Sequence, residues 1–240
     1  MWASISPVLD GVISAVALMM ALMPSAGASV CHPPATIATP HVEQPGSESD
    51  VRRLPIGGYI LALSWSPEYC AGQPHATGFQ CNGDHRFGFV LHGLWPEGKG
   101  RDWPQWCGSA IIVPREVLRE NLCAMPGEQL MQHEWTKHGS CMARTPKAYF
   151  DQARRLYERL KFPDMNWLAG RYRVTAGDVA GAFARANPGM TIDMLRVQAT
   201  RIGALSEIHI CLDTSFKPVR CPAGKRGLSR NARVRIRPNL

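Results

Sequence analysis

The sequence predicts an α+β domain with a mainly antiparallel central sheet, helices packed around that sheet, and stabilising disulfides. Short apolar runs typical of strands occur near both ends of the expected domain, and amphipathic runs typical of helices lie between them. The chain of 240 residues is long enough for one substantial core. Its eight cysteines are an even number, as expected for disulfides in an exported protein.

Four segments have the composition of strands. Tyr59–Trp65 is short and apolar, and Ser66-Pro67 ends it. A second strand is expected over Arg86–Leu94 and a third over Ser206–Leu212. Arg233–Arg237 alternates basic and apolar residues with period two, which favours a fourth strand.

Four helices are predicted between these strands. They span Pro114–Cys123, Gly127–His138, Lys147–Leu160 and Ala176–Ala186. The third begins at Thr145-Pro146 and carries an apolar stripe along one face. The fourth begins with Thr175 and Asp178 at the spacing of a capping box.

The N-terminal region is predicted to lie outside the domain. Residues 1–28 resemble a signal peptide, because an apolar run over 11–23 is followed by Ala26-Gly27-Ala28, a small-x-small cleavage site. No basic residue precedes the run, so an uncleaved anchor is the alternative. Residues 29–51, rich in proline, are expected to form a flexible or extended arm, and residues 52–240 the domain. Cleavage would leave a secreted or periplasmic monomer without stable membrane association.

Charge favours polyanions as partners. The formal net charge is +8. Residues 217–237 contain eight basic residues and no acidic one. This segment is either a groove for an RNA backbone or a solvated edge strand whose arginines block aggregation.

Two short segments contain most of the candidate catalytic side chains. The first, residues 89–96, reads FVLHGLWP and contains His92, and the second, residues 130–141, reads LMQHEWTKHGSC. At about 100° per residue, His133, Glu134, Lys137 and His138 share one helix face about 140° wide. A zinc-protease motif would need a histidine at position 137, where the chain has lysine, so we expect no metal ligands and no cofactor.

The two segments resemble the active-site signatures of the T2 family of ribonucleases. The resemblance implies that His138 is a base, His92 an acid, and His133 a phosphate contact, with Glu134 and Lys137 stabilising the pentacovalent state. The sequence alone leaves the labels of His92 and His138 exchangeable. The family's base site also points to Trp95 and Glu97 as substrate contacts.

These groups are suited to transesterification of RNA. A base removes the 2′-hydroxyl proton, the oxygen attacks phosphorus, and an acid protonates the departing 5′-oxygen. Two imidazoles with pKa values near 6.5 can perform both transfers. We therefore expect cleavage of single-stranded RNA through a 2′,3′-cyclic phosphate, without metal. The resemblance implies little base selectivity.

Local spacing favours the disulfides Cys70–Cys81 and Cys211–Cys221. The family resemblance pairs Cys141 with a cysteine shortly after the first signature, most simply Cys107. Cys31 and Cys123 then remain for each other by elimination only.

Two other functions compete with this hypothesis. One is a non-catalytic basic module, binding RNA or acting as a toxin on the same fold. The presence of His92, Glu134, Lys137 and His138 together argues against it, because a binding module does not need that set. The other is a zinc hydrolase, which chelators would inhibit.

Overall fold

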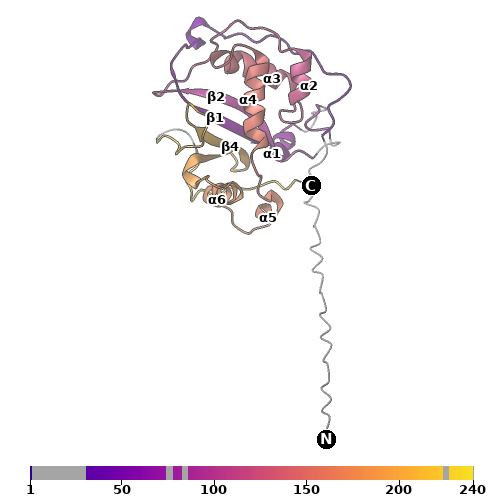
Figure 1. Cartoon of the computed structure of the whole chain (residues 1–240), viewed down its shortest axis with the longest axis vertical. Coiled ribbons are helices and arrows are strands. Elements are labelled where there is room, and N and C mark those ends of the chain that lie inside the picture. Colours follow the sequence, from indigo (N-terminus) through magenta and orange to yellow (C-terminus); the bar gives the residue numbers. More distant parts are fainter. Residues whose placement is uncertain (2–30, 74–77, 83–85, 224–226, 240) are drawn as a thin grey trace.

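Four antiparallel strands form one sheet in the order β2-β1-β4-β3 (Figure 1). β1 (Ile56–Trp65) is central, with β2 (Phe89–Gly98) on one side and β4 (Leu205–Leu212) on the other. β3 (Leu195–Ala199) pairs with β4 at the edge. The computed structural model describes residues 1, 31–73, 78–82, 86–223 and 227–239, so most of the expected signal peptide lies outside the described residues.

Helices cover one side of this sheet. They are α1 (Ser66–Ala71), α2 (Arg115–Asn121), α3 (Glu128–Lys137), α4 (Pro146–Glu158), α5 (Met165–Ala169) and α6 (Ala176–Ala186). Short 3₁₀ turns lie at η1 (Glu48–Asp50), η2 (Gly139–Cys141) and η3 (Ile192–Met194). α4 packs on β1 and β2, α2 packs on α4, and α6 packs on β3 (Figure 1). The α+β class and the antiparallel sheet are therefore confirmed.

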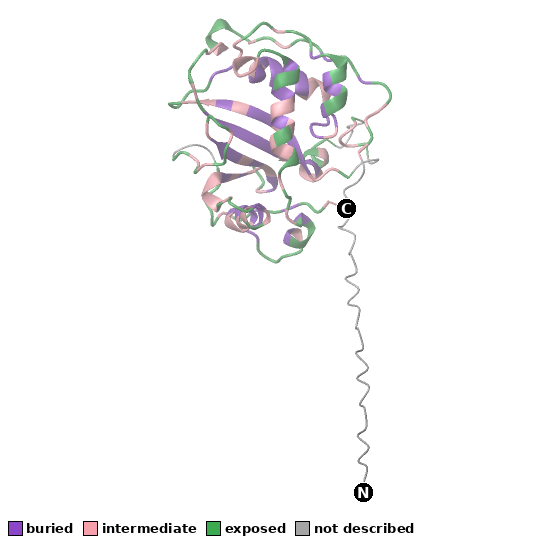
Figure 2. Cartoon of the chain, in the orientation of Figure 1, coloured by how far each residue is buried: buried purple, intermediate pink, exposed green. Residues whose placement is uncertain are grey.

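The sheet has two different faces. Alternate side chains of β1, β2 and β4 join the main core beneath the helices: Tyr59, Leu61, Leu63, Trp65, Leu91, Leu94, Ile208, Ile210 and Leu212. The opposite face has only a small apolar cluster of Ile60, Ala62 and Cys211, with Trp95 and Cys221 packed on it. In Figure 2 the strands are mostly buried. The face opposite the helices is the one that can present polar side chains.

The N-terminal arm is packed on the domain. Residues 31–51 have little regular structure, as expected of an extended segment, but Ile37 is 1% exposed and belongs to the main core. Burying such a side chain contributes roughly 1.5–3 kcal/mol. Cys31 is joined to Cys123, and the Arg119 guanidinium donates to the carbonyl oxygens of Pro34 and Ala35. The structural unit thus begins before residue 52.

The prediction of a strand over Arg233–Arg237 is wrong. Arg233 and Arg235 form isolated bridges with Thr175 and Ala204, and the segment adds no strand to the sheet. Its alternation is real, because Val234 and Ile236 are buried. The segment runs beside a loop and the start of a helix. Its alternation arises because one side of the segment is buried, although no strand pairs with it.

Several basic residues of this segment have partners. Arg220 and Arg230 pair with Asp193, and Arg237 pairs with Glu68. The charge expected for an RNA groove or an exposed edge is thus partly balanced within the protein. Lys225 and Arg226 lie outside the described residues.

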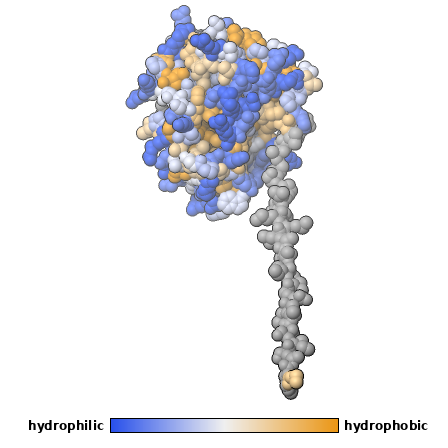
Figure 3. Space-filling model, viewed as in Figure 1, coloured by the Kyte–Doolittle hydropathy of each residue, from blue (hydrophilic) through white to orange (hydrophobic). Residues whose placement is uncertain are grey.

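All four disulfides join the expected partners. They are Cys31–Cys123, Cys70–Cys81, Cys107–Cys141 and Cys211–Cys221. Within the described part of the chain, no helix is long and apolar enough to cross a membrane. Figure 3 shows hydrophilic side chains over much of the face that carries α4, with smaller hydrophobic patches between them.

Replacing both Cys107 and Cys141 by serine should lower the free energy of unfolding by about 4 kcal/mol, because the bridge closes a loop with a sequence separation of 34. Urea unfolding followed by circular dichroism measures this change. A loss below about 1 kcal/mol would mean that the surrounding contacts fix this loop without the bridge.

Candidate active site

The site begins with a β-bulge at His92. Leu91 pairs with Leu63, and Gly93 pairs with Ala62, so His92 has no residue opposite it on β1. A bulge of this kind redirects side chains and is common beside active sites. Its consequence here is a shift in which residues of β2 face the core.

The bulge breaks the period of two along β2. Leu91 and Leu94 both belong to the main core although they are three residues apart. Trp95 packs instead on the small cluster of the opposite face, and its ring centroid lies 5.1 Å from that of His92. Without the bulge, strict alternation would place Leu91 and Trp95 on the same face.

Small residues of β1 let side chains from both flanking strands meet above it. Ala62 and Ser64 lie on the central strand, between His92 of β2 and Glu207 of β4. The His92 Nδ1 and Glu207 Oε1 atoms are 2.5 Å apart. Ser64 Oγ donates to Glu207 Oε1 at 3.2 Å and lies 3.3 Å from His92 Nδ1. A carboxylate 115 residues away in the chain thus holds the imidazole.

Glu134 of α3 lies beneath the same imidazole and is 1% exposed. The Trp95 indole N–H donates to Glu134 Oε2 at 2.8 Å, and the Tyr149 hydroxyl donates to the same oxygen at 3.4 Å. Glu134 Oε1 lies 3.7 Å from His92 Nε2. Both oxygens of this buried carboxyl therefore face polar hydrogen-bonding groups.

Burial raises the pKa of Glu134, although His92, His133, the Trp95 indole and Lys137 oppose the shift. A carboxylate without water is costly unless other groups compensate for its charge. Because its pKa is raised, the carboxyl of Glu134 keeps its proton to a higher pH than an exposed glutamate would.

Gly93 makes room for this carboxyl. A Cβ on Gly93 would overlap Glu134 Oε2 and come within 2.5 Å of Trp95 Nε1. Position 93 needs glycine for space and not for backbone conformation, because Gly93 does not have a positive φ. Glycine next to His92 is therefore explained by the close approach of α3 to the bulge.

His138 caps the C-terminal end of α3 and is 6% exposed. Burial lowers its pKa well below the ordinary value, and the positive charges of Lys137, His133 and His92 lower it further. Among the described residues, no group forms a hydrogen bond with His138 Nδ1. Its ring centroid lies 5.6 Å from that of Trp95. The residue is therefore a neutral imidazole with an unpartnered nitrogen beside the indole.

His92 differs from His138 in its electrostatics. Burial would lower the pKa of His92, but the hydrogen bond to Glu207 and the charges of Glu134 and Glu207 outweigh it, so the pKa is raised. Lys137 opposes that rise. Two imidazoles beside one indole thus have pKa values displaced in opposite directions.

His133 has a carboxylate partner of its own. Its Nδ1 lies 2.5 Å from Oε2 of Glu43, a residue of the N-terminal arm. Gln129 donates to the other Glu43 oxygen at 2.7 Å. The Trp106 ring stands edge-on to the His133 ring, with centroids 6.0 Å apart. His133 thus keeps Nε2 available on the side away from the arm.

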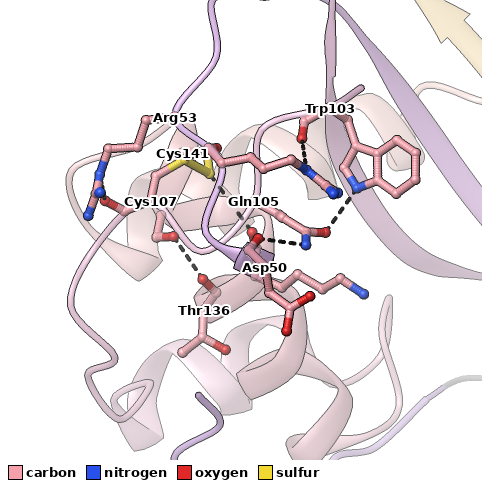
Figure 4. The surroundings of a disulfide bond; sticks show 10 residues. Asp50, Arg53, Trp103, Gln105, Cys107, Thr136 and Cys141 are labelled. Carbon is pink, nitrogen blue, oxygen red and sulfur yellow. Dashed lines mark hydrogen bonds between the residues drawn. A yellow bond between two sulfur atoms is a disulfide. The ribbon is translucent and has the colours of Figure 1, made fainter. Parts of the chain in front are cut away.

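The Cys107–Cys141 disulfide fixes the loop that carries Trp106 (Figure 4). The Trp106 amide donates to the Lys137 carbonyl, which ties the loop to the end of α3. Farther along the loop, Gln105 donates to the Asp50 carbonyl and accepts from the Trp103 indole (Figure 4). The structure places the Trp106 ring beside His133.

Lys137 and Glu97 are the remaining site residues that the sequence predicts. The positive charge of Lys137 acts on Glu134, His92 and His138. Glu97 lies in β2 two residues beyond Trp95 and is partly exposed. Its charge acts on Arg196 of β3, whose pKa burial lowers and Glu97 partly restores. Glu97 thus lies farther along the same strand than the group around His92.

Three side chains at the C-terminal half of α3 that could ligate a metal ion lie closer to one another than their spacing along the helix suggests. Donor atoms of His133, Glu134 and His138 all lie within 4.8 Å of one another. Zinc bonds of about 2.0–2.1 Å in a tetrahedron need donors roughly 3.4 Å apart. His133 Nδ1 is already paired with Glu43, and Glu134 Oε2 with Trp95. A bound zinc ion would require the cluster to contract.

Residues 56–221, more than half of the chain, match the ribonuclease T2 family. The chain belongs to the ribonuclease T2 family. The matched region contains both signatures and every residue of the cluster except Glu43.

Bacterial relatives of this T2 family chain are named ribonucleases. A probable ribonuclease of Haemophilus influenzae is 32% identical over 182 residues, which cover 70% of this chain and 62% of that protein. A ribonuclease of Aeromonas hydrophila is 34% identical over 160 residues, covering 65% of this chain and 71% of that protein.

Solved structures of other proteins share the T2 fold. Trichomaglin, an S-like ribonuclease, has a TM-score of 0.59 at 20% identity, covering 75% of this chain and 97% of its own. RNase NT, solved with 5′-AMP, has a TM-score of 0.58 at 18% identity, covering 78% and 100%. At these identities the likeness shows the fold alone.

Three side chains of this T2 site were missed by the sequence analysis: Glu43, Tyr149 and Glu207. The alternation in β4 offered a signal for one of them, because Glu207 and His209 are polar between the apolar Leu205, Ile208 and Ile210. Glu43 lies in a proline-rich stretch with no periodicity, and Tyr149 looks like an ordinary core residue of α4. Nothing in the sequence near these two marked them as parts of a site.

Gly93→Ala should disrupt the Trp95–Glu134 hydrogen bond and cost about 1–3 kcal/mol of stability, because the new methyl group overlaps the carboxyl. The Trp95 indole proton resonance and the urea midpoint report the two effects. Gly100→Ala is the matched control, since a Cβ there meets nothing within 4 Å. Equal stability of both variants would contradict this account of Gly93.

Proposed function

We propose that the protein is a metal-independent endoribonuclease that cleaves single-stranded RNA by transesterification. The observation that carries the proposal is that the imidazoles of His92 and His138 both lie beside Trp95 and have oppositely displaced pKa values. Membership of the ribonuclease T2 family and the named bacterial ribonucleases support RNA as the substrate.

His138 is the base in this proposal. Burial lowers its pKa, so at neutral pH it is neutral and can accept a proton. It would remove the proton of the ribose 2′-hydroxyl as the oxygen attacks phosphorus. DNA lacks that hydroxyl and should not be cleaved.

His92 is the acid. With its pKa raised, it retains a proton to pH values at which His138 is already neutral. It would protonate the 5′-oxygen as the P–O5′ bond breaks, leaving a 2′,3′-cyclic phosphate. Hydrolysis of that phosphate reverses the two roles and gives a 3′-phosphate.

Glu134, Lys137 and His133 stabilise the charged phosphorane in this proposal. Positive charge and hydrogen-bond donors placed at developing oxyanions contribute several kcal/mol. Lys137 supplies charge, and His133 presents Nε2 because Glu43 holds Nδ1. The raised pKa of Glu134 makes a protonated carboxyl available as a donor to phosphate oxygens.

Trp95 and Glu97 remain candidates for contact with the base, with little base selectivity expected. The Trp95 N–H is engaged by Glu134, so the face of its indole is the part that could stack on a base. Four disulfides support an exported protein, secreted or periplasmic, because such bonds persist outside the cytoplasm. We propose a monomer that binds RNA and needs no cofactor.

The direct test is cleavage of single-stranded RNA by the purified protein in excess EDTA. The wild type should produce 2′,3′-cyclic phosphate ends, while His92→Ala and His138→Ala should each lose roughly 10²–10⁴-fold in kcat/KM. A His41→Ala variant is a suitable control, because His41 lies in the exposed arm outside the cluster.

Other outcomes of the same assay separate the competing functions. Salt-sensitive RNA binding without cleavage would support the basic binding module. Cleavage lost in EDTA and restored by zinc would show that the converging groups of α3 hold a metal ion.

A further inference from the structure

We propose that Glu207 is a positioning residue that makes His92 the proton donor of the reaction. This inference rests on the proposed function. Glu207 belongs to neither signature and lies on β4, two strands away from β2. Glu207 contacts the side chains of His92, Ser64 and His209, so we assign it a role that acts through His92.

The hydrogen bond to Glu207 fixes which nitrogen of His92 faces the reacting groups. A carboxylate only accepts hydrogen bonds, so His92 Nδ1, 2.5 Å from Glu207 Oε1, is the donor in that pair. Nε2 then carries the second proton of the cationic ring. It lies on the side of Glu134, 3.7 Å from Oε1. The proton to be transferred is therefore held on the nitrogen that faces the cluster of α3.

Glu207 is itself held in place by two further groups. Its Oε2 accepts from His209 Nε2 at 2.7 Å, and Oε1 accepts from Ser64 Oγ at 3.2 Å. Gln198 Nε2 lies 3.3 Å from His209 Nδ1 and donates to it, which leaves Nε2 as the protonated nitrogen of His209. The carboxylate thus has defined donors on both oxygens.

The charges around His92 make Glu207 the decisive partner. Burial raises the pKa of the Glu207 carboxyl, but the hydrogen bonds from His209 and His92 and their charges lower it overall, so Glu207 stays ionised. Glu134 also favours the cationic imidazole, whereas Lys137 disfavours it. His138 also lies beside Trp95, and burial lowers its pKa well below the ordinary value, so it is neutral at neutral pH. Glu207 hydrogen-bonds directly to His92 and its pKa is lowered, whereas Glu134 lies 3.7 Å from Nε2 and burial raises its pKa.

The proton balance of the proposed step follows from this arrangement. The 2′-oxygen forms a bond to phosphorus, and its proton passes to His138. The P–O5′ bond breaks, its electron pair stays on O5′, and the proton of His92 Nε2 neutralises that oxygen. His92 Nδ1–H remains bonded to Glu207 throughout, so the ring does not rotate as its charge disappears.

The test compares two substrates with Glu207→Gln. RNA has a poor alkoxide leaving group and needs an acid, whereas a nucleoside 3′-(4-nitrophenyl phosphate) releases a stabilised phenolate without one. The variant should cleave RNA roughly tenfold or more slowly at about pH 8, the effect of about one pKa unit, and cleave the activated ester at close to the wild-type rate. The falling limb of kcat/KM against pH should move to lower pH for RNA.

Glu68→Gln is the matched control, since it removes a carboxylate of comparable burial that pairs with Arg237 and not with a histidine. Glu207→Asp keeps the charge and should restore the falling limb. If Glu207→Gln does not fold, His209→Gln is tested with the same two substrates and its loss should be confined to RNA, whereas Glu207→Asp should keep activity on both substrates.

The results separate this inference from the proposed function. Equal losses on both substrates, or an unchanged falling limb in Glu207→Gln, would overturn the role of Glu207 while the enzyme remains a ribonuclease. A wild-type protein inactive on both substrates would instead overturn the proposed function.

Discussion

The burial of one carboxyl group, that of Glu134, constrains the rest of the site. A carboxyl group that is 1% exposed needs hydrogen-bond donors and nearby positive charge. Trp95 and Tyr149 donate to it, and His92 lies beside it. The space that it fills exists because residue 93 has no side chain. His92 and Trp95, on either side of Gly93, both approach Glu134 of α3, so the fold of β2 and the position of α3 depend on each other.

The two faces of the sheet differ: one forms the apolar core, and the other carries polar side chains of the candidate site. The face beneath the helices is an ordinary apolar core, whereas the opposite face places small residues of β1 between polar side chains of β2 and β4. Distant carboxylates then reach the imidazoles, Glu207 for His92 and Glu43 for His133. Each pairing fixes the orientation of an imidazole through its Nδ1 atom.

Sequence patterns predicted the local features well and the contacts between distant segments poorly. The helix over 176–186, the strand around Tyr59–Trp65 and the two disulfides expected from local spacing, Cys70–Cys81 and Cys211–Cys221, agree with the structure. Periodicity could not reveal the bulge at His92, because a bulge depends on the register between two strands. It also failed for Arg233–Arg237, whose alternation comes from one buried side of a loop. Glu207 is separated from His92 by 115 residues, so only the sheet order reveals the pair.

In the proposed mechanism, the site displaces the pKa values of His92 and His138 in opposite directions. NMR titration of the imidazole resonances of His92 and His138, assigned with single His→Gln variants, measures both values. We expect His92 to lose its proton above the ordinary pKa near 6.5 and His138 to lose its proton below it. The reverse order, or two equal pKa values, would contradict the assignment of acid and base.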